Sequence, residues 1–323
     1  IGPDHVRVVN GSVVQGAGQN GGHPEESVGY SPIYFWEGSD IEVAGTVVEY
    51  SGSQLIGLFT HYQKGNNEFH HNVFVDRGWE VSNRHGLGSS SLAVIGGVNG
   101  VQVHHNLVKR TRHNALTGQV ISSNEIYIDS YATNSFGIRG STSDREGFGN
   151  KIFGTGYHVV GIGWGKNTWW HDNFIHLVGQ GPDFRYSEYG NQESLNGFRL
   201  TQYAGATEDL SNVVVERNLV LISEGACSVD DECTQARGLQ HTSDPNVVDN
   251  VIRDNTIKVV MDDLVTQAAS IVTQGTSSLC GTEAPVRYDN NTLISNILNV
   301  RMGDYAGAGC NHHFTGNELV QVG

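Results

Sequence analysis

Short runs of alternating apolar and polar residues, each followed by an asparagine, recur along the whole chain. VQVHHNLV, VVVERNLVL and VIRDNTIKV show the form, which is an alternating segment, an asparagine and a second apolar segment. Alternation with a period of two predicts half-buried β-strands, and no stretch has the helical period of 3.6 residues. Because the asparagine separates two predicted strands, we expect it to mark a turn between them.

The same pattern recurs with 18 to 45 residues between successive turns. The predicted turn residues are Asn10, Gly45 (in IEVAGTVVE), Asn72, Asn106, Asn124, Asn150, Asn173, Asn218, Asn255, Asn291 and Asn317. Repetition of one short motif indicates a solenoid, and strands this short and closely spaced argue against βαβ units. We therefore predict stacked coils whose equivalent asparagines form a ladder of side-chain hydrogen bonds.

These Asn turns resemble those of the right-handed parallel β-helix in the pectin-lyase-like superfamily, over nearly the whole chain. The resemblance implies an all-β solenoid of about ten coils, with the Asn turn between the second and third strands of each coil. We expect one domain over residues 1–323, with loop insertions near 16–31, 76–100, 178–195 and 223–236. In most relatives the ligand groove lies on the sheet of first strands, here LIGLFTH (55–61), FGIRG (136–140) and NGFRLTQY (196–203) among others.

Alternation within these first strands sorts the side chains by face. With Phe198 and Leu200 pointing into the core, Arg199 and Tyr203 point outward into the groove, and Arg139 does the same in residues 136–140. The insertion at 178–195 would form a wall of the groove. The predicted substrate-binding residues are Arg185, Tyr186, Arg199 and Tyr203.

The charge distribution favours an anionic ligand for the middle coils. The chain has a formal net charge of −15, but residues 64–199 have a net charge of about +1 between two acidic ends. The alternative is that acidic ends serve solubility. The absence of a basic stripe with aromatic residues argues against a nucleic-acid partner, and no apolar run is long enough for a membrane span.

One local motif resembles chondroitinase B and the related alginate lyases. Lys64 is followed about one coil later by Arg84-His85-Gly86. In those enzymes the lysine removes a proton and the arginine helps to protonate the leaving group, which implies these roles for Lys64 and Arg84. They also bind Ca²⁺ through acidic residues just before the lysine, whereas LFTHYQ (58–63) contains none. A surface lysine and a loop arginine are the alternative.

HHN occurs at 70–72 and again at 104–106, both times at a predicted turn. This recurrence favours a structural role for His104 and His105, through ring stacking or hydrogen bonding at the turn. Further along, Arg112 and His113 fall at the predicted groove edge. HHN followed by an arginine resembles pectate lyases, where the arginine removes the proton, although their Arg-x-Pro context is absent here.

Cleavage of an acidic polysaccharide by β-elimination fits these features best. The uronate carboxylate must be neutralised, a base must remove the C5 proton, and an acid must protonate the leaving oxygen. The predicted catalytic residues are Lys64, Arg84, His85, Arg112, His113 and Arg139; no metal ligand is assigned, and Ca²⁺ enters only through the resemblance.

Other functions stay open. The same fold serves in non-catalytic adhesins, tailspikes and filament subunits, and open solenoid ends favour end-to-end self-association. A glycoside hydrolase would need two suitably spaced carboxylates. A uronate epimerase shares the first proton abstraction with a lyase.

Four cysteines favour an exported protein. Cys227 and Cys233 are close in the sequence, and Cys280 and Cys310 are farther apart. An even number favours two disulfides, with reduced buried thiols as the alternative. The chain starts without Met in a strand-like segment, so we expect a processed chain and a secreted or extracellular location.

Overall fold

The structure is a computed structural model, and it describes eighteen segments of the chain, to which every structural statement below refers. They are residues 5–14, 33–36, 38–50, 58–61, 65–76, 90–95, 99–110, 125–129, 143–154, 158–163, 165–178, 194–201, 210–223, 235–243, 247–261, 267–275, 286–302 and 312–323. Within these segments the secondary structure is β-strand, and no helix has the length and apolarity needed to cross a membrane.

The strands form three sheets, which we number by strand order within a coil. Sheet 1 contains β3 (Ile33–Trp36), β6 (Leu58–His61), β9 (Ser90–Ile95), β12 (Glu125–Asp129), β15 (His158–Gly163), β18 (Ser194–Thr201), β21 (Gln235–Ser243), β25 (Gln267–Gly275) and β28 (Leu298–Met302). Sheet 2 contains β1 (Arg7–Val9), β4 (Glu42–Ala44), β7 (Asn67–His70), β10 (Asn99–His104), β13 (Ser143–Phe148), β16 (Gly165–His171), β19 (Leu210–Glu216), β23 (Val251–Arg253), β26 (Val286–Asp289) and β29 (His312–Thr315), with β22 (Val247–Val248) paired to β19. Sheet 3 contains β2 (Ser12–Val14), β5 (Val47–Tyr50), β8 (Val73–Asp76), β11 (Leu107–Arg110), β14 (Lys151–Gly154), β17 (Phe174–Val178), β20 (Leu219–Ser223), β24 (Thr256–Val260), β27 (Thr292–Ser295) and β30 (Glu318–Gln321).

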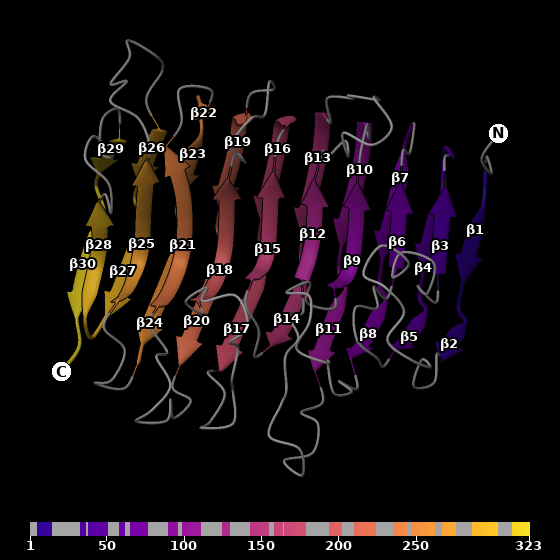
Figure 1. The fold of residues 1–323 in the computed structure, drawn as a ribbon, viewed down its shortest axis with the longest axis horizontal. Helices are drawn as coiled ribbons and strands as arrows, with labels where there is room; N and C mark the ends of the chain where they lie inside the picture. Colours follow the sequence, from indigo (N-terminus) through magenta and orange to yellow (C-terminus); the bar gives the residue numbers. More distant parts are fainter. Residues whose placement is uncertain are drawn as a thin grey trace, which may run out of the picture.

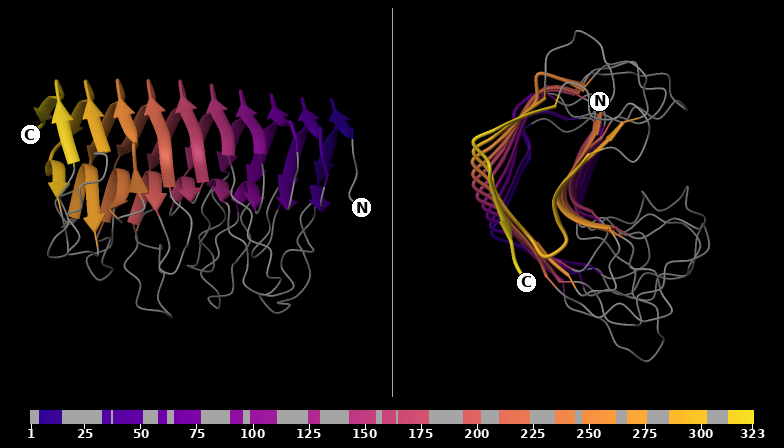
Figure 2. Two further views of the ribbon diagram at one scale, coloured as in Figure 1. Left: turned by 90° about the horizontal axis from the view of Figure 1, so that it is seen from above. Right: turned by 90° about the vertical axis from the view of Figure 1, so that its left-hand side faces the viewer.

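Every strand pairs in parallel with the equivalent strand of the next coil, so the chain winds as a solenoid (Figure 1). Seen along the stacking axis, the three sheets are three walls around one interior (Figure 2). The bend between sheets 2 and 3 lies on the side away from sheet 1. The predicted all-β parallel β-helix is therefore confirmed, as are the coil number and the position of the Asn turn.

The core lies between the walls and follows the alternation seen in the sequence. On β10, Val101 and Val103 are fully buried whereas Gln102 between them is exposed. Larger side chains such as Phe69 and Trp170 fill the same interior. Burial of each inward apolar side chain contributes about 1.5–3 kcal/mol, which drives the winding of the coil.

The asparagine ladder is continuous over eight coils. Nδ2 of Asn72 donates to Oδ1 of Asn106 at 3.1 Å, and Nδ2 of Asn106 donates to Oδ1 of Asn150 at 3.0 Å. Each donor asparagine also donates its backbone N–H to the same oxygen. The ladder residues are Asn72, Asn106, Asn150, Asn173, Asn218, Asn255, Asn291 and Asn317. These eight predicted turn residues are confirmed.

The first two coils are shifted by one residue from the prediction. In the ladder coils the residue before the asparagine is left-handed, as at His71 with φ 54°. Asn10 (φ 54°) and Gly45 (φ 60°) occupy this left-handed position instead of the ladder position. Thr46 then takes the ladder position of its coil, where its N–H donates to Oδ1 of Asn72 at 3.0 Å. Asparagine tolerates left-handed backbone well, so it serves either position of the turn.

The coil between β11 and β13 also differs from the prediction. Residues 125–129 form β12 of sheet 1, which pairs with both β9 and β15. The predicted turn at Asn124 is therefore wrong, because EIYID alternates equally well as a first strand and as a third strand. The strand expected at 136–140 lies outside the described residues, and β12 already occupies the place between β9 and β15.

Most of the expected insertions and all four cysteines lie outside the described residues. Residues 90–95, inside the insertion expected at 76–100, form β9 of sheet 1. The insertions expected near 16–31, 178–195 and 223–236 lie mostly outside the described residues. All four cysteines also lie outside them, so the disulfides stay a prediction.

Candidate functional site

The outer face of sheet 1 is where the sequence predicts the ligand groove. Phe198 and Leu200 on β18 are fully buried, as predicted. Arg199 lies between them and is half-buried. Because neighbouring side chains of a strand point to opposite faces, Arg199 lies on the outer face.

Strand pairing extends this position into a row across four strands. Arg199 is aligned with Gln240 on β21, Gln240 with Val272 on β25, and Val272 with Arg301 on β28. We call these four residues the arginine row. At the usual strand spacing it is about 14 Å long. On the other side of Arg199, the aligned residue is Gly161, which has no side chain.

The arginine row carries two guanidinium groups. A guanidinium is planar, and its N–H donors are arranged to suit a carboxylate. Gln240 is only 5% exposed, whereas Arg199 and Arg301 are half-buried. Partial burial lowers the local dielectric, so an anion here interacts more strongly than at a fully exposed surface.

The other predicted site residues lie outside the described segments and stay predictions. They are Lys64, Arg84, His85, Arg112, His113, Arg139, Arg185, Tyr186 and Tyr203.

A second chemical region lies at the bend between sheets 2 and 3, just before the asparagine ladder. The last residues of four successive sheet 2 strands stack as parallel rings. His70 and His104 have ring centroids 4.9 Å apart, His104 and Phe148 4.6 Å, and Phe148 and His171 5.2 Å. Their interplanar angles are 4–8°. The expected ring stacking of the HHN histidines is thus present, and strand pairing sets its spacing.

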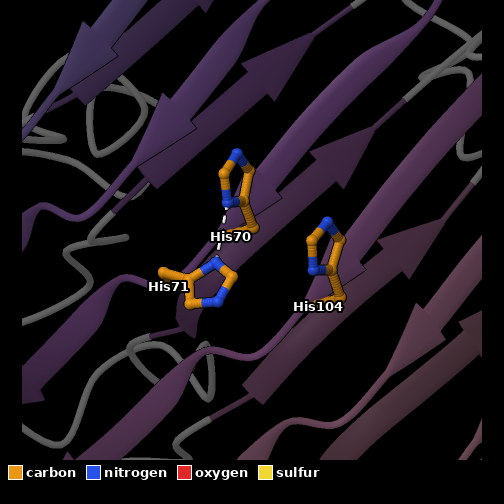
Figure 3. A group of neighbouring side chains, drawn as sticks. All are labelled: His70, His71 and His104. Carbon is orange, nitrogen blue, oxygen red and sulfur yellow. Dashed lines mark hydrogen bonds between the residues drawn. The ribbon is translucent and has the colours of Figure 1, made fainter.

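The next residues of two of these coils form a second stack. His71 and His105 are both exposed, with centroids 5.0 Å apart and an interplanar angle of 11°. Nδ1 of His70 lies 2.8 Å from Nδ1 of His71, and Nδ1 of His104 lies 2.8 Å from Nδ1 of His105. We call these four residues the histidine corner. Figure 3 shows His70 and His71 facing each other across this contact, with His104 beside them.

Glutamates on the outer face of sheet 2 contact the other nitrogens of these rings. Nε2 of His104 lies 2.7 Å from Oε1 of Glu68, and Nε2 of His70 lies 3.3 Å from Oε1 of Glu42. The sequence analysis missed these carboxylates. The available signal was the period-two alternation of NEFH, which places Glu68 and His70 on one face of β7.

Neighbouring charges shift the pKa values at this bend. The hydrogen bond from Arg7 lowers the pKa of Glu42, with a smaller contribution from His70. Burial lowers the pKa of His105, and the adjacent charges of His104 and His71 lower it further. Burial and the neighbouring rings thus favour the neutral form of His105, which keeps a lone pair on one ring nitrogen.

Farther along the same bend, Glu216 holds an ion-pair network. Its carboxylate accepts hydrogen bonds from Nε of Arg253 at 2.5 Å, from Nε1 of Trp169 at 3.1 Å and from Arg217. Arg217 also donates to Asp172 at 3.0 Å. Burial opposes ionisation of Glu216, but the two arginines outweigh it and lower its pKa.

Comparison with known proteins gives the fold only. No protein-family model matches the chain, and no curated protein matches it. A mutant tailspike protein of E. coli bacteriophage HK620 is similar in structure, with a TM-score of 0.51 and 9% identity over 88% of this chain and 48% of the tailspike. The tailspike of the same phage in complex with a pentasaccharide gives a TM-score of 0.50 and 9% identity, over 88% of this chain and 49% of the tailspike. The chain therefore spans about half the length of these tailspikes, and shares their β-helix fold.

Proposed function

We propose that the chain binds an acidic, uronate-containing polysaccharide along the outer face of sheet 1 and cleaves it by β-elimination. The observation that carries the proposal is the row of Arg199, Gln240, Val272 and Arg301, which are aligned across four adjacent strands of that face. The tailspike that shares the fold binds a pentasaccharide, which supports a carbohydrate ligand for this chain.

The arginine row suits the first requirement of the reaction, which is neutralisation of the uronate carboxylate. A uronate carboxylate next to C5 must be neutralised before the C5 proton becomes acidic, and a guanidinium does this through paired hydrogen bonds. Arg199 and Arg301 lie about 14 Å apart along the row, so each can bind a different uronate of one chain. Gln240 lies between them but is only 5% exposed, so the two arginines are the residues of the row that are proposed to bind the polymer.

Elimination then breaks the C5–H and C4–O bonds and forms a C4=C5 double bond. A base accepts the C5 proton, and an acid gives a proton to the leaving O4, so the charges balance. The residues proposed for these two steps are the predicted Lys64, Arg84, His85, Arg112, His113 and Arg139. Arg185, Tyr186 and Tyr203 are proposed to extend the substrate contacts beyond the row.

Calcium does not fit the residues at the position that the resemblance implies. The lyases that bind Ca²⁺ before the catalytic lysine use acidic side chains, whereas β6 and the two residues after it read LFTHYQ. Ca²⁺ prefers several oxygen ligands at 2.3–2.6 Å, which this segment does not provide through carboxylates. The mechanism proposed here therefore relies on arginine rather than calcium.

Carbohydrate binding without cleavage is the second candidate, and the row itself favours it. Two arginines and a glutamine bind carboxylates but provide no group that gives up and takes back protons near neutral pH. Such a protein would act as an adhesin or as the binding part of a longer tailspike-like chain.

The test is to incubate the chain with alginate, pectate and chondroitin and follow ultraviolet absorbance. A lyase produces unsaturated uronates that absorb, whereas a hydrolase produces reducing ends without this absorbance. Arg199→Ala should weaken binding of the cleaved polymer about ten-fold in affinity electrophoresis. Arg287→Ala, an exposed arginine on β26 of sheet 2, is the matched control and should bind normally.

Lys64→Ala and Arg84→Ala separate cleavage from binding. We expect them to abolish product formation while polymer binding persists. Binding without any product in the unaltered chain would reject the lyase and leave the binding protein. Equal binding by the Arg199→Ala and unaltered chains would reject the arginine row as the site.

A further inference from the structure

We propose that the histidine corner is a binding site for a late transition metal ion such as Zn²⁺, with His70, His71 and His104 as ligands. The site lies at the bend between sheets 2 and 3 and is independent of the carbohydrate face. Each of the three side chains offers one nitrogen, and these three atoms lie within 4.8 Å of one another (Figure 3). Imidazole nitrogens are preferred ligands of Zn²⁺, Cu²⁺ and Ni²⁺, whereas Ca²⁺ and Mg²⁺ prefer oxygen.

The coil repeat explains why these rings meet. Residues 70–72 and 104–106 both read HHN, and the asparagines of the two turns are bonded to each other at 3.1 Å. The ladder thus fixes the two turns in register, which places equivalent histidines one strand spacing apart. A cluster from two adjacent coils is more rigid than one on a loop, because strand pairing holds both backbones.

The carboxylates prepare the rings for metal binding. A carboxylate at Nε2 favours the tautomer in which Nε2 carries the proton, which leaves a lone pair on Nδ1. Glu68 contacts Nε2 of His104 at 2.7 Å, and Glu42 contacts Nε2 of His70 at 3.3 Å. Without a metal, these two Nδ1 atoms face Nδ1 of His71 and of His105 at 2.8 Å. A metal ion would replace those hydrogen bonds, in the carboxylate–histidine–metal arrangement typical of zinc sites.

His71 completes the set with a small rearrangement. Its Nδ1 lies 2.8 Å from Nδ1 of His70, which without a metal requires one proton between the two nitrogens. His71 is exposed, so it can move that proton to Nε2, where water accepts it. Ligands of a tetrahedral zinc ion are about 3.3 Å apart, given Zn–N distances of 2.0–2.1 Å. Binding thus separates His70 and His71 slightly and draws His104 toward them.

His171 occupies the position equivalent to His70 three coils farther along the bend, but it is followed by an aspartate instead of a second histidine. There Nδ1 of His171 contacts Oδ2 of Asp172 at 2.6 Å, and Asp172 also accepts hydrogen bonds from Arg217. The Nδ1 atom of His171 is thus engaged by a carboxylate. At the HHN turns the same nitrogen instead faces a second imidazole, so that a metal ion can bind both rings in place of the hydrogen bond between them.

The test is calorimetric titration of the whole chain, cleared of metal by a chelator, with zinc chloride. We expect saturable binding at micromolar or lower zinc that weakens in acid, because protons compete with the metal for the ring nitrogens. Any binding of calcium or magnesium chloride should be the same in His71→Asn as in the unaltered chain. The melting temperature should rise by about 2 °C or more with excess zinc, because the metal binds the folded chain.

His71→Asn is the decisive variant, because this chain already has Asn290 with φ 53° at the equivalent position of another coil. It should keep the metal-free melting temperature and lose about ten-fold or more in zinc affinity. His313→Asn, an exposed histidine on β29, is the control and should keep the affinity. Glu68→Gln should also weaken zinc binding about ten-fold by removing the carboxylate from His104. Unchanged zinc affinity in His71→Asn, or no zinc binding by the unaltered chain, would overturn the proposal whatever the outcome with polysaccharides.

Discussion

Nδ2 of Asn150 lies 2.9 Å from Oδ1 of Asn173, and the same oxygen accepts the backbone N–H of Asn150 at 3.0 Å. One side-chain oxygen therefore satisfies two buried donors of the preceding coil. Nδ2 of Asn150 also donates to the backbone carbonyl of Val103, which ties the turn to β10 of the preceding coil. Each ladder asparagine from Asn72 to Asn291 is thus both a donor to the next coil and the acceptor for the previous one.

Replacing a central ladder residue should be costly. In Asn150→Leu, the backbone N–H and Nδ2 of Asn106 both lose their acceptor in a buried turn. Each unsatisfied buried donor costs about 1–3 kcal/mol, so we expect the free energy of unfolding to fall by roughly 3–5 kcal/mol. Urea denaturation measures this. Asn290→Gly, at an exposed left-handed position, should change the stability by less than about 0.5 kcal/mol. Equal effects of the two substitutions would contradict the role assigned to the ladder.

Gly147 and Trp170 lie side by side on neighbouring strands, and the space between them should not admit a larger residue than glycine at position 147. A Cβ on Gly147 would lie 2.4–2.5 Å from three atoms of the buried Trp170 ring. We expect Gly147→Ala to destabilise the chain by about 1–3 kcal/mol through overpacking. Trp170→Leu alone should cost about 3 kcal/mol through the cavity that it leaves. In the double variant the alanine enters space vacated by the ring, so the combined loss should be smaller than the two losses added together. Simple additivity, measured by thermal unfolding, would show that the two residues do not compete for space.

The buried His241 should make the fold sensitive to mild acid. Burial lowers its pKa to about 3, whereas a histidine in an unfolded chain has a pKa near 6.5. Between these values the unfolded chain binds more protons than the folded chain. The free energy of unfolding is therefore unaffected by His241 above pH 6.5 and falls as the pH drops below it. The expected slope is about 1.4 kcal/mol per pH unit for this one group.

His241→Leu removes that titration. Leucine is chosen because the residue aligned with His241 on the neighbouring strand is Leu200, which is also buried. We expect the stability of the variant to depend less steeply on pH between about 6.5 and 4, by close to one proton. Thr273→Val changes the same inward row without removing a titratable group, and should keep the slope. Parallel pH profiles for His241→Leu and the unaltered chain would refute the prediction.

Glu216 should matter more than a glutamate in an exposed ion pair. It is almost fully buried and accepts hydrogen bonds from Arg217, Arg253 and Trp169. Glu216→Gln leaves two arginines without their shared countercharge, for an expected loss of about 2–3 kcal/mol at neutral pH. Because the folded pKa of Glu216 is lowered, its contribution is present above pH 4.5 and lost as the pH falls below it. Glu42→Gln, which weakens an exposed pair, should cost at most about 1 kcal/mol in the same urea titration.

The ladder could be predicted from sequence because it links equivalent residues. A residue whose side chain bonds to its counterpart in the next coil recurs from coil to coil, as the eight asparagines from Asn72 to Asn317 do. The prediction failed where the same residue type serves another purpose. Asn10 occupies the left-handed position of its turn, and Asn124 precedes a strand of sheet 1.

The outer face of sheet 1 was only partly predictable. Alternation around Phe198 and Leu200 correctly predicted that these two side chains are buried, which assigns Arg199 to the outer face. The sequence did not indicate that Arg199 and Arg301 lie in one row, because long connections of different length separate β18, β21, β25 and β28. Spacing along the chain therefore does not indicate which outward residues share a row.

The sequence by itself determined that the chain winds into stacked coils, where eight of these coils turn, and that two turns carry the same pair of histidines. Only the tertiary structure decided that Glu68 meets His104, a residue 36 positions later, and that four imidazoles gather at one bend. The physical reason is that turns are local, since a few residues and their backbone angles suffice to form them. Contacts between coils instead depend on the register that strand pairing and the asparagine ladder impose across connections of unequal length.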